Sequence, residues 1–161
     1  MTYLAAFFYV AAMLMANLLV SKYGPAISPV LAFFLIGFDL SMRDWLHVRL
    51  RTWQMVGLIG VAGALTYGLS PAAGMIAVAS AVAFTSGALV DWAAFTRLRG
   101  SWLLRANGSN VAGAAVDSLI FPTLAFGALM PNIVLLQFVA KVAGGAIWAT
   151  LMNHASKKVE A

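Results

Sequence analysis

Two ionisable residues lie inside long apolar stretches of this chain, where a side chain of that kind can bind a proton, an ion or a polar ligand. Asp117 follows the small-residue run "SNVAGAAV", and Lys141 follows "LQFVA". A charge inside hydrocarbon is unfavourable, so such residues normally face a bundle interior or a cavity. We expect the two side chains to lie at similar depth. They form either a structural ion pair that locks two helices together or part of a polar site.

Helical spacing favours the polar site. Asn110, Gly113 and Asp117 fall at i, i+3 and i+7, which is one face of a helix, and Lys141 shares a face with Trp148 in the same way. Small residues alone are typical of close packing between membrane helices. A carboxylate, an amide and a tryptophan at one depth indicate a pocket for a polar ligand instead.

A second set of charges marks the ends of two apolar stretches. Asp39 and Arg43 are four residues apart, a spacing at which side chains pair along one helix. Asp91 ends a later stretch, and we expect it to pair with a loop arginine. We interpret these three residues as structural or gating charges rather than as ligands for a substrate.

Composition assigns the chain to the integral membrane proteins. Of its 161 residues, 63% are hydrophobic and 9% are charged, whereas about 25% are charged in soluble domains. The net charge of +5 is therefore not the footprint of a nucleic acid, and we expect no such partner. Cysteine is absent, which excludes disulfides, thiolate metal sites and cysteine nucleophiles. His47 and His154 have no second ligand at metal spacing, so we expect no metal, no cofactor and no enzyme activity.

Six apolar segments approach the roughly 20 residues that a helical membrane span needs. They are Thr2–Val20, Pro29–Met42, Trp53–Leu69, Pro71–Val90, Val111–Met130 and Pro131–Met152. The second segment is the shortest, and it either begins nearer Gly24 or is partly re-entrant. The predicted fold class is all-α: a polytopic membrane protein in which residues 1–161 form a single domain of six transmembrane helices.

The basic residues alternate along the chain in a way that predicts the orientation of the spans. Eight of them follow the second, fourth and sixth spans, whereas Lys22 alone lies between spans on the other side. Because basic loops stay in the cytoplasm, we expect both termini to be cytoplasmic. The eight residues are Arg43, Arg49, Arg51, Arg97, Arg99, Arg105, Lys157 and Lys158. Tryptophans flank these loops, as interfacial anchors do: Trp45, Trp53, Trp92 and Trp102.

Several stretches resemble the queuosine precursor transporter family, also called the putative vitamin uptake transporter family. They are "AFFLIGFDLSMRDW", "IAVASAVAFTSGALVDWAAFTRLR", "GSNVAGAAVDSLIFPTLAF" and "LQFVAKVAGG", with "ANLLVSKYG" as a looser match. The resemblance covers most of the chain, although its loops and termini are shorter than is usual in that family. It implies a six-span protein of the bacterial cytoplasmic (inner) membrane that imports 7-cyano-7-deazaguanine or the related aminomethyl base.

The resemblance also implies roles for the candidate site. A 7-deazaguanine base presents adjacent ring N–H and amino donors, and the Asp117 carboxylate is the candidate acceptor for both. Asn110 or Asn17 is a candidate for bonding the carbonyl edge of the base. Trp148 or Phe121 is a candidate for stacking on the ring, and Lys141 is a candidate for holding the charge of the carboxylate. The whole substrate-binding set is Asp117, Asn110, Lys141, Asn17, Ser109, Trp148 and Phe121.

Three alternatives stay open beside the transporter. One is a substrate-binding membrane subunit of a multi-component vitamin uptake system, which needs a separate energising complex. Another is a non-transporting membrane interaction protein, in which an apolar pair could replace Asp117 and Lys141. An intramembrane enzyme is the third, and no nucleophile–base set supports it. The expected partners are a small nucleobase and the lipid bilayer, with association into a homo-oligomer left open.

Overall fold

The computed structural model describes residues 2–159, whose secondary structure consists of helices joined by short loops, without strands. The long helices are α1 (Thr2–Tyr23), α3 (Gly37–His47), α4 (Thr52–Leu69), α5 (Gly74–Arg97), α6 (Trp102–Phe126) and α7 (Pro131–Val159). Short segments complete the chain: η1 (Pro25–Ile27), α2 (Ser28–Leu31), η2 (Ala32–Ile36) and η3 (Pro71–Ala73). The prediction of an all-α polytopic membrane protein is confirmed.

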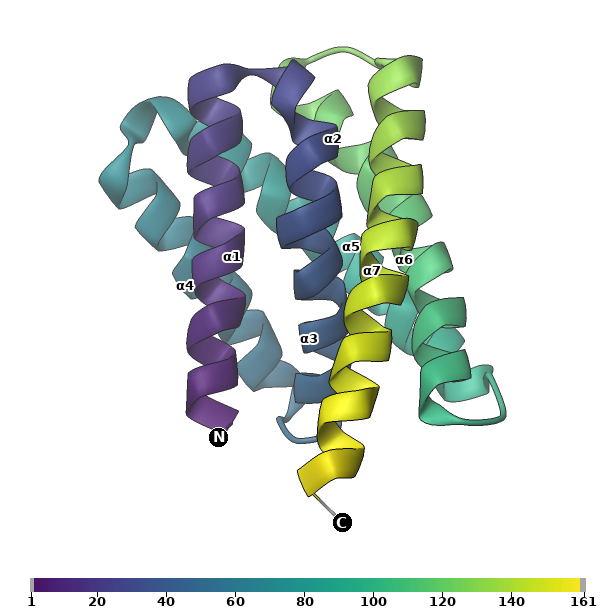
Figure 1. Cartoon of the computed structure of the whole chain (residues 1–161). Helices are drawn as coiled ribbons and strands as arrows, with labels where there is room; N and C mark the ends of the chain where they lie inside the picture. The colour runs from purple at the N-terminus through teal and green to yellow at the C-terminus, as the bar shows by residue number, and fades with distance from the viewer. Residues whose placement is uncertain (1, 160–161) are drawn as a thin grey trace.

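The chain passes six times along the bundle, and Figure 1 shows α1 beginning and α7 ending at the same end. Five segments are long and apolar enough to cross a membrane: Thr2–Tyr23, Pro25–His47, Pro71–Arg97, Trp102–Phe126 and Pro131–His154. The remaining pass is α4, whose 18 residues extend about 27 Å. We call the end that carries the loops after α3 and α5, with their arginines, the basic end. The structure describes the backbone of Lys157 and Lys158 as part of α7 but not their side chains.

Two predicted spans begin several residues earlier in the structure, and the fourth continues to Arg97 rather than ending at Val90. The second span is not short, because η1, α2, η2 and α3 form one continuous pass over Pro25–His47, 23 residues long. It includes one stretch of π-helix, Ala32–Ile36. The fifth span begins at Trp102 rather than Val111, since α6 continues through the polar run before Asn110, and it ends at Phe126. Packing inside the bundle, rather than hydrophobicity, keeps that polar run helical.

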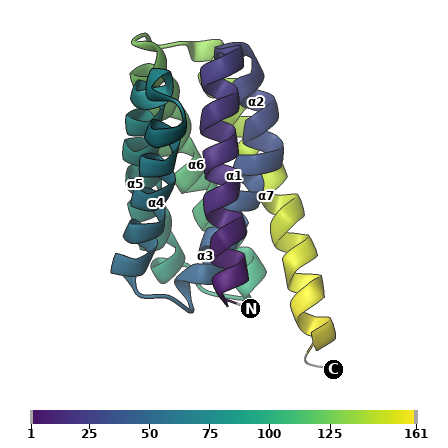
Figure 2. The same ribbon diagram turned by 90° about the vertical axis from the view of Figure 1, so that its left-hand side faces the viewer.

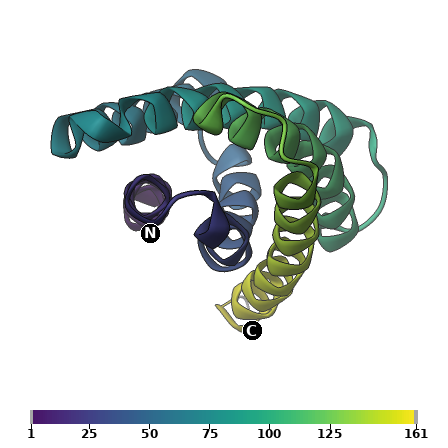
Figure 3. The ribbon, with the colours of Figure 1, turned by 90° about the horizontal axis from the view of Figure 1, so that it is seen from above.

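The six passes form a closed ring. In order around the ring, α1 packs on α4, α4 on α5, α5 on α6, α6 on α7, α7 on the second span, and the second span on α1. Figure 2 shows α4 and α5 side by side, and Figure 3 shows α4, α5 and α6 in one curved row with α1 and the second span in front. Outward faces expose apolar side chains such as Phe7, Leu65 and Leu135, as lipid-facing surfaces do. The buried polar side chains therefore lie inside the ring.

Glycines allow two of these helix pairs to approach closely. A methyl group on Gly144 of α7 would overlap the backbone carbonyl of Phe33, and one on Gly37 would lie 2.7 Å from the carbonyl carbon of Gly144. On the other side of the ring, a methyl on Gly87 would lie 3.0 Å from the carbonyl oxygen of Gly113. Only a residue without a side chain fits such crossings, as is typical of membrane helix interfaces.

We expect the exchange Gly144→Ala to destabilise the bundle strongly. The added methyl meets backbone of the second span, which cannot rotate aside, and overpacking of this kind costs about 1–3 kcal/mol or more. The measurement is the thermal midpoint of the detergent-solubilised protein. Gly60→Ala on α4 is the matched control, because no atom lies within 4 Å of the new methyl, and its midpoint should not fall. Equal midpoints for the two variants would contradict the close crossing.

Candidate functional site

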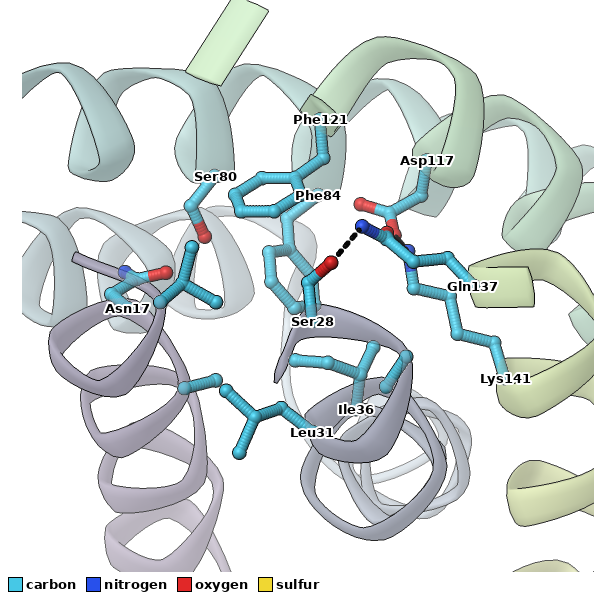
Figure 4. Close-up of a pocket in the computed structure, with 13 residues that line it drawn as sticks. Asn17, Ser28, Leu31, Ile36, Ser80, Phe84, Asp117, Phe121, Gln137 and Lys141 are labelled. Carbon is cyan, nitrogen blue, oxygen red and sulfur yellow. Dashed lines mark hydrogen bonds and ion pairs between the residues drawn. The ribbon is translucent and has the colours of Figure 1, made fainter. Parts of the chain in front are cut away.

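A pocket lies inside the ring, in the half of the bundle away from the basic end. All passes except α4 contribute to its wall, and Figure 4 shows the polar groups of these helices pointing toward one another. We call it the central pocket. Its lining residues are Ala16, Asn17, Val20, Ser28, Leu31, Ala32, Ile36, Ser80, Phe84, Asp117, Phe121, Gln137 and Lys141.

A chain of polar contacts forms one side of the central pocket. Lys141 forms an ion pair with the Oδ2 atom of Asp117 and also donates to the Oε1 atom of Gln137 at 3.0 Å. Gln137 donates in turn to the Ser28 hydroxyl at 2.9 Å, the dashed contact in Figure 4. Lys141 as a whole is 2% exposed. Its charge is therefore held by protein atoms rather than by water.

The ion pair lies near mid-membrane. Asp117 precedes the end of α6 at Phe126 by nine residues, and Lys141 follows the start of α7 at Pro131 by ten. At 1.5 Å per residue, each is about 14–15 Å from that end of the bundle, halfway through a hydrocarbon layer about 30 Å thick. The predicted similarity in depth, and the contact between the two groups, are both present.

The rest of the lining carries an amide and two aromatic rings. Asn17 donates from its amide nitrogen to Thr66 at 3.2 Å, and Figure 4 shows its oxygen directed toward the pocket. Ser80 adds a hydroxyl, and the rings of Phe84 and Phe121 add flat apolar surface. The pocket thus combines a charged side, an amide acceptor and aromatic surface.

The central pocket is nearly closed in this conformation. It leaves about 20 Å³ for the centre of a water-sized sphere, and a cavity needs about 10–15 Å³ by that measure to hold one water molecule. A bicyclic ligand enters only if the helices around the pocket separate. The pocket is therefore a pre-arranged set of polar groups that has to open before it can bind a small molecule.

Three of the predicted substrate-binding residues lie elsewhere. Asn110 is buried two helical turns nearer the basic end, beside Asp44. Ser109 faces its own helix and donates to the carbonyl of Ala106 at 3.2 Å. Trp148 packs edge-on against Phe38, with ring centroids 5.1 Å apart. The structure brings Asp117, Lys141, Asn17 and Phe121 together and leaves these three outside the central pocket.

The predicted pairing of the other charges is wrong. Arg43 does not pair with Asp39 one turn away, and Asp91 does not pair with a loop arginine. Instead the Nη2 atom of Arg43 lies 3.3 Å from the Oδ2 atom of Asp91, across the interior of the ring. Both oxygens of Asp39 are left without a hydrogen-bond partner. A contact between helices replaces the local contact that sequence spacing favoured.

Sequence reasoning missed several residues of the interior. Gln137 lies four residues before Lys141, so helical spacing alone places both on one face. Ser28 and Thr66 carry no comparable signal, because each is an isolated hydroxyl in an apolar segment. Tyr9 and Asp44 were not singled out either, although both are buried, Tyr9 completely.

Six helical passes around a buried, charged pocket define a polytopic membrane protein with a polar interior. A family model described as "Putative vitamin uptake transporter" matches residues 3–153. The chain belongs to this family, and it is a multi-pass membrane transporter for vitamin-type substrates. No curated protein and no solved structure gives a significant match.

Proposed function

We propose that the chain imports a queuosine precursor, 7-cyano-7-deazaguanine or its aminomethyl analogue, across the bacterial cytoplasmic membrane. The basic end faces the cytoplasm in this proposal, because basic loops are retained there. The central pocket then lies toward the outer side, where the base arrives. The stretches that resemble queuosine precursor transporters include the parts of α6 and α7 that carry Asp117 and Lys141.

The observation that carries the proposal is the half-occupied carboxylate of Asp117. Lys141 donates a hydrogen bond to the Oδ2 atom of Asp117. No donor among the described residues forms a hydrogen bond with the Oδ1 atom of Asp117, which lines the central pocket. The guanine edge of the base offers a ring N–H and an amino group side by side, and a carboxylate accepts both. The free oxygen accepts one donor, and the second donor shares the oxygen that Lys141 already holds.

Further contacts fit the rest of the base. The rings of Phe84 and Phe121 supply flat surface for stacking, which is how proteins hold bases taken out of a helix. The amide group of Gln137, which lies beside Lys141, supplies a donor for the base carbonyl once the pocket opens. Asn17 supplies an acceptor from the rest of the lining. The paired donors, the carbonyl and the ring faces of the base thus each have a buried counterpart in the central pocket.

Uptake of radiolabelled base tests the proposal. We expect cells that cannot make 7-deazaguanines, and that lack any energising complex for vitamin uptake, to accumulate the base only when they express this chain. Unlabelled guanine should compete at least about tenfold better than adenine, because adenine lacks the paired donors and each 1.4 kcal/mol corresponds to tenfold in affinity. Uptake no higher than in cells with an empty vector would overturn the proposal. Equal competition by the two bases would overturn the role of the carboxylate.

A further inference from the structure

A second group of buried polar side chains lies between the central pocket and the basic end. We call it the inner cluster, and it consists of Tyr9, Asp39, Arg43, Asp44, Asp91 and Asn110. All six residues are at most 3% exposed. They come from α1, α3, α5 and α6, so the cluster holds four passes together around one point of the interior.

The charges of the inner cluster do not balance. Three carboxylates surround a single guanidinium, and only Asp91 forms an ion pair with it, at 3.3 Å. If all the carboxylates were ionised, the cluster would carry two uncompensated negative charges inside the membrane. Buried unpaired charges are strongly unfavourable, so the cluster needs positive charge from another source.

Unsatisfied polar atoms show where that charge is missing. Within residues 2–159, the cluster atoms without a hydrogen-bond partner are both oxygens of Asp39, one oxygen each of Asp44 and Asp91, the Tyr9 hydroxyl, both amide atoms of Asn110, and the Nε and Nη2 atoms of Arg43. Asp39 is fully buried. A proton on its carboxylate removes the charge and turns one oxygen into a donor.

A metal ion fits the inner cluster less well. Sodium-like and divalent cations need several oxygen ligands that converge on one point. Among residues 2–159, no three acidic or histidine side chains converge in that way. A proton needs no such set of ligands, so we take it as the counter-charge.

A cavity lies beside Arg43, nearer the basic end than Asp39. This cavity, between α3, α4 and α5, has about 180 Å³ for the centre of a water-sized sphere, and Thr52 and Thr85 are among its polar lining residues. Arg43 and His47 line it on α3, and Trp92 lines it on α5. Toward the central pocket, the charged neighbour of Asp39 is Asp117. Asp39 thus lies between the proposed substrate site and a cavity at the basic end.

We propose that Asp39 is a proton-binding site that couples import of the base to entry of one proton. The proton binds the carboxylate when the central pocket is open to the outside and leaves it through the cavity beside Arg43. The buried titratable and charged groups on the surrounding helices are Tyr9, Arg43, Asp44, Asp91, Asp117 and Lys141. This inference rests on the proposed transport of the base.

Purified protein in liposomes separates the two proposals. Exchange of labelled base against unlabelled base inside the vesicles needs only binding and movement of the base, whereas accumulation against a gradient needs the proton. For one proton per base, we expect each unit of acid-outside pH gradient to raise accumulation about tenfold, because one pH unit is 1.36 kcal/mol per proton. A protonophore should abolish this accumulation and leave exchange intact.

The decisive variant is Asp39→Asn, a neutral isostere of the protonated residue. We expect it to keep exchange, which shows that it is folded, and to lose the tenfold response to pH. Ser41→Ala is the matched control: Ser41 is buried on the same helix, donates to Gly145 at 2.9 Å and lies outside the inner cluster. It should keep both activities.

Each contrary outcome has a distinct meaning. Exchange by the unaltered chain without any pH response, or with a response to sodium instead, would overturn the proton site. A full pH response in Asp39→Asn would overturn the assignment to Asp39. No exchange at all by the unaltered chain would overturn the proposed function, and the proton site with it.

Discussion

Uptake of the base should fall by about 10- to 100-fold in the double variant Asp117→Asn, Lys141→Met, although that variant still reaches the membrane. The two substitutions remove both charges of the ion pair at once, so neither charge is left without its partner in the central pocket. The base loses a charge-assisted hydrogen bond, which contributes about 1.5–3 kcal/mol. Labelled-base uptake, divided by the amount of protein in the membrane, measures the effect.

The single variant Asp117→Asn explains why the double variant is needed. It leaves Lys141 buried beside a neutral amide, and breaking a buried pair in this way costs about 3–5 kcal/mol. Loss of uptake in the single variant is thus expected from misfolding alone. If the ion pair only clamps α6 to α7, the double variant will transport normally, and Asp117 is then not a ligand for the base.

The exchange Arg43→Met should prevent stable folding. Arg43 is the cation of the inner cluster, and without it Asp91 loses its partner at 3.3 Å while Asp39 and Asp44 stay buried nearby. We expect a loss of about 3–5 kcal/mol. The thermal midpoint in detergent and the amount of protein in the membrane are the measurements.

Arg49→Gln is the control for Arg43→Met. Arg49 is exposed, stacks 3.7 Å from the ring centre of Trp45 and donates to its carbonyl at 2.9 Å. Exposed interactions of this kind contribute about 0–1 kcal/mol, so this variant should fold normally. If Arg43→Met were as stable as Arg49→Gln, all three carboxylates of the inner cluster would have to be neutral in the folded protein.

Most of the membrane-spanning helices could be predicted because each of them is a long run of mainly apolar residues. A run of apolar residues admits only a helix in hydrocarbon, and prolines at Pro71 and Pro131 mark where two of the spans begin. The start of α6 could not be read in this way, since Arg105, Asn107 and Asn110 make its first turns polar. Its helicity depends on contacts with α5 that the sequence does not display.

The candidate site was partly predictable for the same reason. Asp117 and Lys141 are conspicuous because a charge in an apolar run is rare, and their depths follow from counting residues. Their neighbours depend on how helices rotate and cross, which spacing within one helix does not determine. Arg43 illustrates the limit: the i, i+4 rule favours Asp39, yet the bundle places Asp91 closer.

The pairing of Arg43 with Asp91 also has a consequence for the synthesis of the protein. Asp91 follows Arg43 by 48 residues, which a ribosome adding about 5–20 residues per second needs about 2–10 s to make. During that interval the second span leaves the ribosome with a guanidinium whose final partner does not yet exist. Arg43 lies four residues before His47, where this pass ends, so it opposes insertion by less than the about 2.5–3.5 kcal/mol of an arginine at the centre of a helix. The second span therefore gains this ion pair only when α5 has been made and lies beside it.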